Sequence, residues 1–150
     1  MFDQLIRMLK TPEPQRRPDP RLSVAVLLVE AARQDDQFDV QERAVIERLL
    51  TQKFSLTADE CAALLAAGEA RAGELVQLHG HTSAIFETMT LDERIGVIEM
   101  LWEVAYADGV LDPLEDTLLR RIAGLIDVSD HERGDAKRRV LQRLGLQPAS

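Results

Sequence analysis

Apolar residues along this chain recur at helical spacing, and two stretches are apolar around almost their whole circumference. These stretches are residues 22–32 and residues 95–105. A helix that is apolar on all sides belongs at the centre of a bundle, where neighbouring helices cover it. Residues 39–53 and 112–126 follow them and confine their apolar side chains to one stripe. The pattern therefore predicts two central helices, each followed by an amphipathic helix.

Helix starts are marked by residues that cap a first helical turn. Asp19 before Pro20 is one start, since Pro favours the first helical position. The capping-box spacing, Ser or Thr followed three residues later by Glu, occurs at Thr57 and Glu60, Thr90 and Glu93, and Ser129 and Glu132. No stretch alternates apolar and polar residues far enough to predict a strand. We therefore expect an all-α fold of about seven helices, with two pseudo-twofold-related three-helix units and a short N-terminal helix.

The chain divides into four segments. Residues 1–10 have an amphipathic pattern that predicts a short helix docked on the domain, with a peripheral membrane contact as the alternative. Residues 11–19 are a Pro-rich connector, which is expected to be extended and stiff. Residues 20–145 form the helical domain, and residues 146–150 form a tail.

One cysteine and two histidines are candidates for metal binding or catalysis. A third helix is predicted over residues 57–76, with Cys61 on its apolar stripe. We expect a core thiol there, because no base is placed near it. His79, Gly80 and His81 are predicted to break the helix. Two imidazoles fall short of a four-ligand zinc set, so a solvated loop is expected.

An acidic segment occurs twice, at residues 30–49 and 103–122. At an offset of 73 residues, three acids recur with the spacing D-x3-D-x2-E and the apolar positions stay in register. Repetition at one offset indicates a duplicated structural unit. The three acids are Asp35, Asp39 and Glu42 in the first copy, and Asp108, Asp112 and Glu115 in the second.

These acids fall into two groups. The second and third acids of each copy have the spacing of a helix N-cap and its N3 glutamate, so capping alone explains them. Asp35 and Asp108 are instead placed at the C-terminal end of a helix, where the macrodipole disfavours a negative charge. Together with the capping acids they would gather three carboxylates, and Asp36 adds a fourth to the first copy. Hard oxygen ligands of this kind suit Ca²⁺, Mg²⁺ or Mn²⁺, and Zn²⁺ is a further candidate.

The second acidic turn matches only part of an EF-hand. Its sequence DGVLDPLE corresponds to positions 5 to 12 of the twelve-residue calcium loop. Val104 and Tyr106 stand where the leading ligands of that loop would be. We therefore expect a weaker or differently built site, and the alternative is a purely structural loop with a solvated acidic face.

Composition narrows the function classes. A net charge of −8 disfavours nucleic acid, whose binding relies on phosphate neutralisation, and favours cations or basic partners. The single Cys61 excludes an internal disulfide, and no apolar run is long enough to span a membrane, so we expect a cytoplasmic protein without a transmembrane segment. No nucleophile with a positioned base and no phosphate-binding loop accompanies the acids, so we expect no enzymatic activity.

The two helix pairs with their D-x3-D-x2-E turns, and above all AYADGVLDPLED at residues 105–116, resemble the tellurite-resistance TerB family. That family in turn resembles the N-terminal domain of a membrane-anchored DnaJ-like co-chaperone. The resemblance covers about residues 20–143. It implies an all-helical fold, an acidic metal-binding cluster and a non-enzymatic role in stress response or membrane-linked complexes. The cluster residues it implies are Asp35, Asp39, Glu42, Asp108, Asp112 and Glu115, with Glu30 and Glu103 as weaker candidates.

Two functions follow as hypotheses. The first is a TerB-like module that binds a divalent cation at its acidic turns and presents a face to a protein partner, which is basic or membrane-associated. The alternative is an interaction domain that needs no metal and docks a basic partner on its acidic face.

Overall fold

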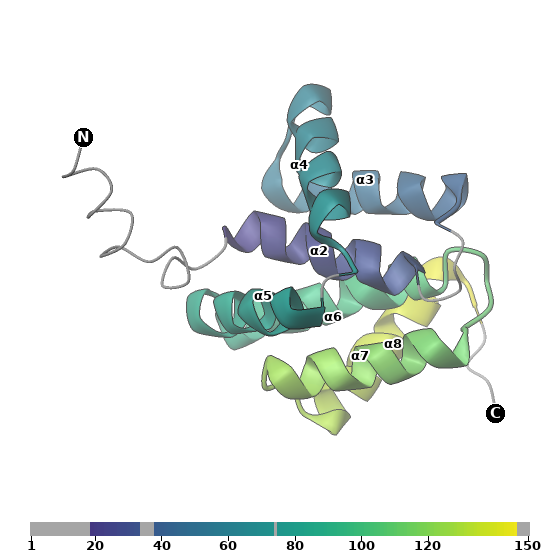
Figure 1. Cartoon of the computed structure of the whole chain (residues 1–150). Helices are drawn as coiled ribbons and strands as arrows, with labels where there is room; N and C mark the ends of the chain where they lie inside the picture. The colour runs from purple at the N-terminus through teal and green to yellow at the C-terminus, as the bar shows by residue number, and fades with distance from the viewer. Residues whose placement is uncertain (1–18, 34–37, 74, 147–150) are drawn as a thin grey trace, which may run out of the picture.

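The protein is all-helical in the parts that its computed structural model describes, residues 19–33, 38–73 and 75–146. Seven helices are present there and no strand, as predicted (Figure 1). Their bounds are α2 (Pro20–Ala32), α3 (Val40–Phe54), α4 (Ala58–Arg71), α5 (Leu75–Thr88), α6 (Leu91–Ala105), α7 (Pro113–Leu125) and α8 (Asp130–Leu144).

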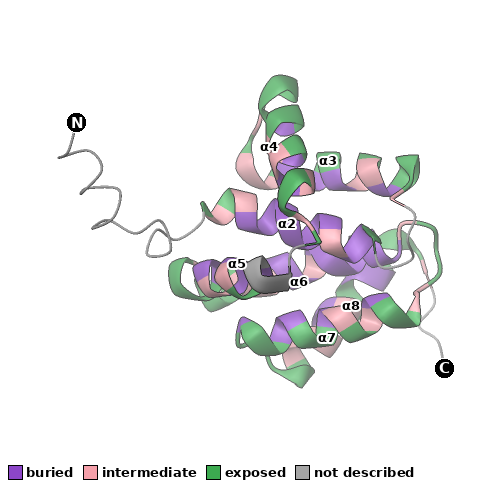
Figure 2. Ribbon diagram, in the orientation of Figure 1, coloured by how far each residue is buried: buried purple, intermediate pink, exposed green. Residues whose placement is uncertain are grey.

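The two helices predicted to be central form the core. In α2 every residue from Ser23 to Val29 is buried, and in α6 every residue from Met100 to Tyr106, just past its end, is buried (Figure 2). The two helices contact each other, and α2 also contacts α3, α4, α5 and α7. Because their apolar residues cover the whole circumference, only a position surrounded by other helices removes all of that surface from water.

The remaining helices cover these two. Helices α3 and α4 pack on α2, α7 and α8 pack on α6, and α5 contacts both α2 and α7. The approach of α4 to α2 is close, because a Cβ atom at Gly68 would lie 3.1 Å from the Cβ of Ala25 and 3.2 Å from its carbonyl carbon. The α6–α8 contact includes a hydrogen bond of 3.2 Å from Nε1 of Trp102 to the carbonyl oxygen of Arg133.

The predicted helix starts are confirmed. Asp19 caps α2 with Pro20 in its first turn, and Asp39 forms a capping box with Glu42 at the start of α3. Helix α8 ends at Gly145, whose φ of 70° lies in the left-handed region that glycine adopts at low cost. The capping boxes at α4, α6 and α8 are those of Thr57 with Glu60, Thr90 with Glu93, and Ser129 with Glu132.

One predicted helix boundary is wrong. The break expected at His79–Gly80–His81 instead lies at Ala72 and Gly73, and all three residues are inside α5. Gly73 has a φ of 92°, a conformation that costs a residue with a side chain more than it costs glycine. Gly80 is tolerated inside α5, because the helix is held by buried residues around it, including Ala84 and Ile85.

Helices α6, α7 and α8 repeat the order of α2, α3 and α4, and they start 71, 73 and 72 residues later. Their derivation from a duplicated unit stays a prediction. The predicted N-terminal helix, residues 11–18 of the connector and residues 147–150 of the tail lie outside the described residues. None of the helices that the structure describes is long and apolar enough to cross a membrane.

Candidate functional site

The acidic turns follow the two central helices. Helices α2 and α6 contact each other and run toward the same end of the bundle, on the right in Figure 1. The α6–α7 turn, residues 106–112, is described in full. For the α2–α3 turn the structure describes Arg33, Phe38 and Asp39, whereas the predicted ligand Asp35 and its neighbour Asp36 lie outside the described residues.

The α6–α7 turn is a compact backbone structure. The amide of Gly109 donates to the carbonyl oxygen of Tyr106 at 2.9 Å, and Gly109 has a φ of 86°. Oδ1 of Asp108 accepts the amide of Val110 at 3.0 Å, which is the local hydrogen bond of an Asx turn. Asp108 therefore has a structural role in addition to the predicted ligand role. The hydrogen bond of the Asx turn explains why an acid is found just beyond the end of α6.

The second acid of each copy caps a helix, but the two caps differ. Oδ1 of Asp39 accepts the amide of Glu42 at 2.8 Å, and the amide of Asp39 donates back to Oε1 of Glu42 at 3.4 Å. Oδ1 of Asp112 instead accepts the amide of Leu114 at 2.7 Å. The capping-box geometry predicted from the spacing of Asp112 and Glu115 is therefore not the one adopted. Capping by Asp112 itself is confirmed.

The third acid of each copy is buried. Glu42 is 5% exposed and Glu115 is 4% exposed, although both lie in the first turn of a helix next to solvent-facing residues. Removing a carboxylate from water is costly unless charge or hydrogen bonds compensate it. The spacing predicted helix caps at these positions and did not indicate this burial, which depends on how α3 and α7 pack against their neighbours.

The weaker candidate Glu103 is committed to ion pairs. Its side chain, 7% exposed, accepts from Arg48 of α3 at 3.0 Å and from Nη2 of Arg143 of α8 at 2.9 Å. Arg143 also contacts Glu99 at 2.7 Å, and its hydrogen bonds to Glu99 and Glu103 raise its pKa above the ordinary value. This network ties α3 and α8 to α6. Glu30, the corresponding residue of the first copy, accepts the amide of Gly73.

The described acids do not form a preassembled metal centre. Among the described residues no group of three or more His, Cys, Asp or Glu side chains is arranged to hold a metal ion. Asp108 and Asp112 of the turn and Glu115 of α7 are thus close in sequence without forming such a group. The predicted set of the first copy includes Asp35, so the structure does not describe it as a whole. The ligand sets stay predictions.

The two histidines lie on different sides of α5. His79 is exposed, and His81 is fully buried with its Nδ1 atom 2.9 Å from Oγ of Ser23 in α2. Two residues along a helix turn the side chain by about 200°, so the pair cannot chelate one ion from the same face. The predicted solvated loop is therefore wrong, and His81 is a core residue that links α5 to α2.

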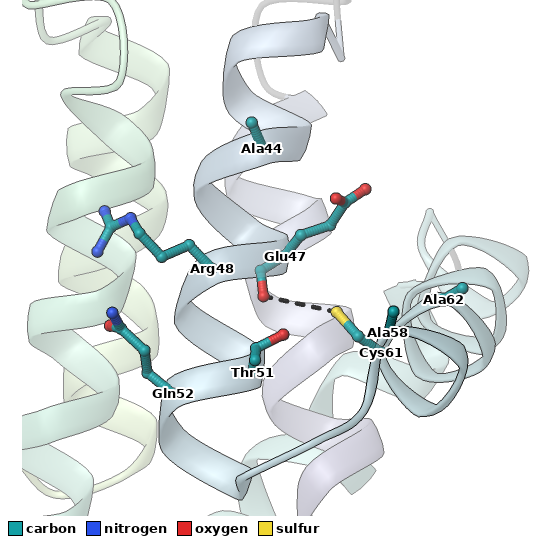
Figure 3. A pocket seen from close by; sticks show the side chains of 8 residues that line it. All are labelled: Ala44, Glu47, Arg48, Thr51, Gln52, Ala58, Cys61 and Ala62. Atoms are coloured by element: carbon teal, nitrogen blue, oxygen red, sulfur yellow. Dashed lines mark hydrogen bonds between the residues drawn. The ribbon is translucent and has the colours of Figure 1, made fainter.

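Cys61 is buried, as predicted, at the contact of α3 and α4. Its Sγ atom donates to the carbonyl oxygen of Glu47 at 3.5 Å (Figure 3). A cavity of about 460 Å³ lies beside it, and small side chains such as Ala44 and Ala58 form part of the lining. The cysteine thus packs as an apolar residue and forms part of the cavity lining.

Apolar side chains are exposed close to the second acidic turn. Val110 is 69% exposed and Leu114 is 58% exposed. Both lie within two residues of Asp108 or Asp112 in the sequence. Contiguous exposed apolar surface is a feature of interaction sites, and these two side chains are candidates for such a surface.

Comparison with known proteins gives one family match. The family model described as tellurite resistance protein TerB matches residues 21–138. This span contains α3 to α7 whole, nearly all of α2 and most of α8, and both acidic turns. No curated protein and no solved structure matches the chain.

Proposed function

The chain belongs to the tellurite resistance protein TerB family, and we propose that it is a non-enzymatic TerB module that binds a divalent cation at its acidic turns. In this role it acts within complexes of the stress or tellurite-resistance response. The family match covers more than half of the chain and includes the turns themselves. Metal binding and the role in such complexes are our proposal.

The buried carboxylates of Glu42 and Glu115 are the observation that supports the cation site best. They occupy corresponding positions, each one helical turn after a capping aspartate, and each is almost inaccessible to water. A carboxylate with little exposure to water loses hydration, and this loss is offset by partners within the protein, to which a nearby cation would add. In this proposal the cation adds to the partners that Glu42 and Glu115 already have.

The second turn offers oxygen atoms to such an ion. In both Asp108 and Asp112 the Oδ1 atom accepts a hydrogen bond from a backbone amide. We therefore expect the Oδ2 atom of each to coordinate the cation. Carbonyl oxygens at the end of α6 add neutral oxygen ligands. With oxygen donors alone, Ca²⁺, Mg²⁺ and Mn²⁺ suit the site better than Zn²⁺, which takes nitrogen and sulfur ligands more often. Because the acids do not converge in the structure, we expect weak binding that draws the turn together.

Calorimetric titration with Ca²⁺, Mn²⁺, Mg²⁺ and Zn²⁺ tests this proposal. Binding heat is expected for the unmodified chain and is expected to be lost in the double variant Asp35→Asn with Asp108→Asn. Asp92→Asn is the matched control, because Asp92 is an exposed acid in the first turn of α6 and not in either acidic turn. Absence of heat with all four cations, or equal binding by the double variant, would exclude the site.

A second candidate function is partner binding without metal, and the exposed Val110 and Leu114 favour it. An acidic surface with apolar side chains fits a basic amphipathic helix, since charge sets the approach and apolar contact supplies affinity. Such binding weakens with salt and is indifferent to a chelator.

A labelled basic amphipathic peptide is the probe for this second function. Fluorescence anisotropy is expected to show binding that falls between low and high salt and is unchanged by EDTA. Val110→Ser with Leu114→Ser is expected to weaken it. Leu91→Ser is the control, because Leu91 is exposed at the start of α6, away from the acidic turns. Binding that requires added metal, or that survives the double serine variant, would count against this second function.

A further inference from the structure

A groove of about 400 Å³ lies between the start of α2 and helix α4. It lies at the N-terminal end of α2, whereas the acidic turns follow the C-terminal ends of α2 and α6. Its apolar lining is Leu22, Leu56, Ala63, Leu64 and Ala67. The three leucines are only half-buried, so the described part of the chain leaves apolar surface uncovered here. Covering it would remove apolar area from water at a gain of about 25 cal/mol per Å².

The position of the groove points to the segment that covers it. Asp19 belongs to the groove lining and is also the first residue that the structure describes, so residues 1–18 join the domain at the rim of the groove itself. The connector of residues 11–18 contains three prolines and at about 3.1 Å per residue reaches roughly 25 Å. Residues 1–10 are therefore within reach of the groove from the same chain.

The composition of residues 1–10 matches the groove. Four apolar side chains recur there at helical spacing and form one face, namely Phe2, Leu5, Ile6 and Leu9. Arg7 and Lys10 are basic residues in the same segment. The groove offers leucine and alanine side chains between α2 and α4. An apolar face that meets apolar lining buries surface on both sides without stranding a polar group.

The charges at the rim agree with this match. Glu60 lies at the rim, and hydrogen bonds from the backbone and side chain of Thr57 lower the pKa of its carboxyl, so it is ionised at neutral pH. Asp59, next to it, is exposed. Arg21 also lies at the rim but is paired with Asp19 at 3.3 Å. The rim is therefore acidic on balance, opposite in sign to Arg7 and Lys10.

We propose that residues 1–10 bind in cis to the groove between α2 and α4. The tether makes this contact intramolecular, so the effective concentration of the segment at the groove does not depend on the protein concentration. Occupancy hides the apolar face of the segment from membranes and from other proteins. The proposal does not depend on the cation site, which lies at the other end of α2.

Hydrogen exchange of the amides in residues 1–10, measured by mass spectrometry on the full chain, tests the proposal. Amides of residues 1–10 exchange only while the segment is dissociated from the groove. If the dissociation constant of this contact is tenfold below the effective concentration, exchange is about tenfold slower than in a free segment. In Ala63→Glu this protection is expected to be lost, because a charged side chain then fills the apolar lining. Ala66→Glu is the matched control, since Ala66 is an exposed alanine of the same helix that does not line the groove.

A second pair of variants changes the segment and leaves the helical domain untouched. Leu5→Asp with Ile6→Asp is expected to abolish the protection of residues 1–10, and Gln4→Asp, on the opposite side of the predicted helix, is expected to retain it. Amide protection within α2 is expected to be equal in all of these variants, which confirms that the domain stays folded.

Four results would overturn the proposal. The first is the absence of protection in the unmodified chain. The second is protection that persists in both Ala63→Glu and the Leu5→Asp, Ile6→Asp variant. The third is protection that rises with protein concentration, which would assign the groove to the segment of a second copy. The fourth is protection that needs vesicles of phosphatidylglycerol and phosphatidylcholine, which would assign the segment to a membrane surface.

Discussion

Carboxylates close together in the sequence have different surroundings in this protein. Asp108 closes a turn, Asp112 caps a helix, and Glu115 three residues later is buried. Glu103 in the preceding helix is held between two arginines from other helices. Residue type and spacing therefore do not determine what each acid contributes, and each contribution needs its own measurement.

The first residue-scale prediction concerns Glu103. Glu103→Gln removes the charge that pairs with Arg48 and Arg143, and we expect the free energy of unfolding to fall by about 1–2 kcal/mol in a urea titration. The value is below that for a fully buried pair, because the two arginines are half-exposed, at 47% and 50%. Asp116→Asn is the control. Its partner Arg120 is mostly exposed, so a change within about 0.5 kcal/mol is expected. Equal effects of the two substitutions would contradict the structural role of Glu103.

The second residue-scale prediction concerns acid. Hydrogen bonds from Thr57, Thr90 and Ser129 lower the pKa values of Glu60, Glu93 and Glu132, respectively, below 4.5. A group whose folded pKa is lowered contributes stability above its unfolded pKa, and this contribution is lost as pH falls through the folded pKa.

Stability is therefore expected to decrease below about pH 4.5, and part of this decrease is expected to vanish in the triple variant Glu60→Gln, Glu93→Gln and Glu132→Gln. Urea midpoints measured from pH 7 to pH 2 check this. An identical pH profile for the triple variant would show that these capping boxes do not contribute to acid sensitivity.

At the scale of elements, two glycines inside helices have opposite surroundings. Gly68 of α4 faces Ala25 of α2 across a close contact, whereas a Cβ at Gly80 of α5 would meet no atom within 4 Å. The close approach of α4 to α2 thus depends on the absence of a side chain at Gly68. Gly80, for its part, only weakens the helix that contains it.

Gly68→Ala and Gly80→Ala are therefore expected to change stability in opposite directions. Gly68→Ala adds a methyl group against the backbone of a central helix and is expected to cost about 1–3 kcal/mol. Gly80→Ala is expected to stabilise the protein by about 0.5–1 kcal/mol, because alanine favours a helix interior. Thermal or urea unfolding of both variants measures this. Destabilisation by Gly80→Ala would contradict the continuity of α5 through His79 and His81.

At the scale of the whole molecule, the two three-helix groups share one core. Helix α2 contacts α6 directly, and α5 bridges α2 and α7. Each of the seven described helices contributes buried residues to one hydrophobic cluster. One group therefore cannot unfold without exposing the central helix of the other, and cooperative unfolding is expected.

Core substitutions in either central helix are expected to destabilise both groups together. Leu28→Ala in α2 and Leu101→Ala in α6 each remove a fully buried side chain, at an expected cost of about 2–5 kcal/mol. In each variant the slowest-exchanging amides of α2 and α6 are expected to lose protection by the same factor. Unequal loss, confined to the group that carries the substitution, would show that the groups unfold separately.

Much of the fold was predictable because its signals are local. The apolar circumference of α2 and α6 and the capping boxes depend on residues within a few positions of one another. The break between α4 and α5 was misplaced, since both Gly73 and Gly80 are permitted break points and only packing selects between them. A break at Gly80 is unfavourable, because it would expose the buried contact between His81 and Ser23.

The candidate site was predictable only in part. Its location in the two acidic turns and the capping roles of Asp39 and Asp112 follow from spacing. The spacing of the acids does not predict the Asx turn of Asp108 or the burial of Glu115. The partners of Glu103 lie 55 and 40 residues away in the sequence, at Arg48 and Arg143, so no local pattern could indicate them.

By itself, the sequence determined the helical class, the two central helices, most helix starts and the position of the acidic turns, because each depends on side-chain periodicity or hydrogen bonds within one turn. Only the tertiary structure decided which acids are buried, which are paired with arginine, and which face solvent. Those properties depend on how far a carboxylate is removed from water and on the charges that other helices bring to it, and both are set when the helices pack.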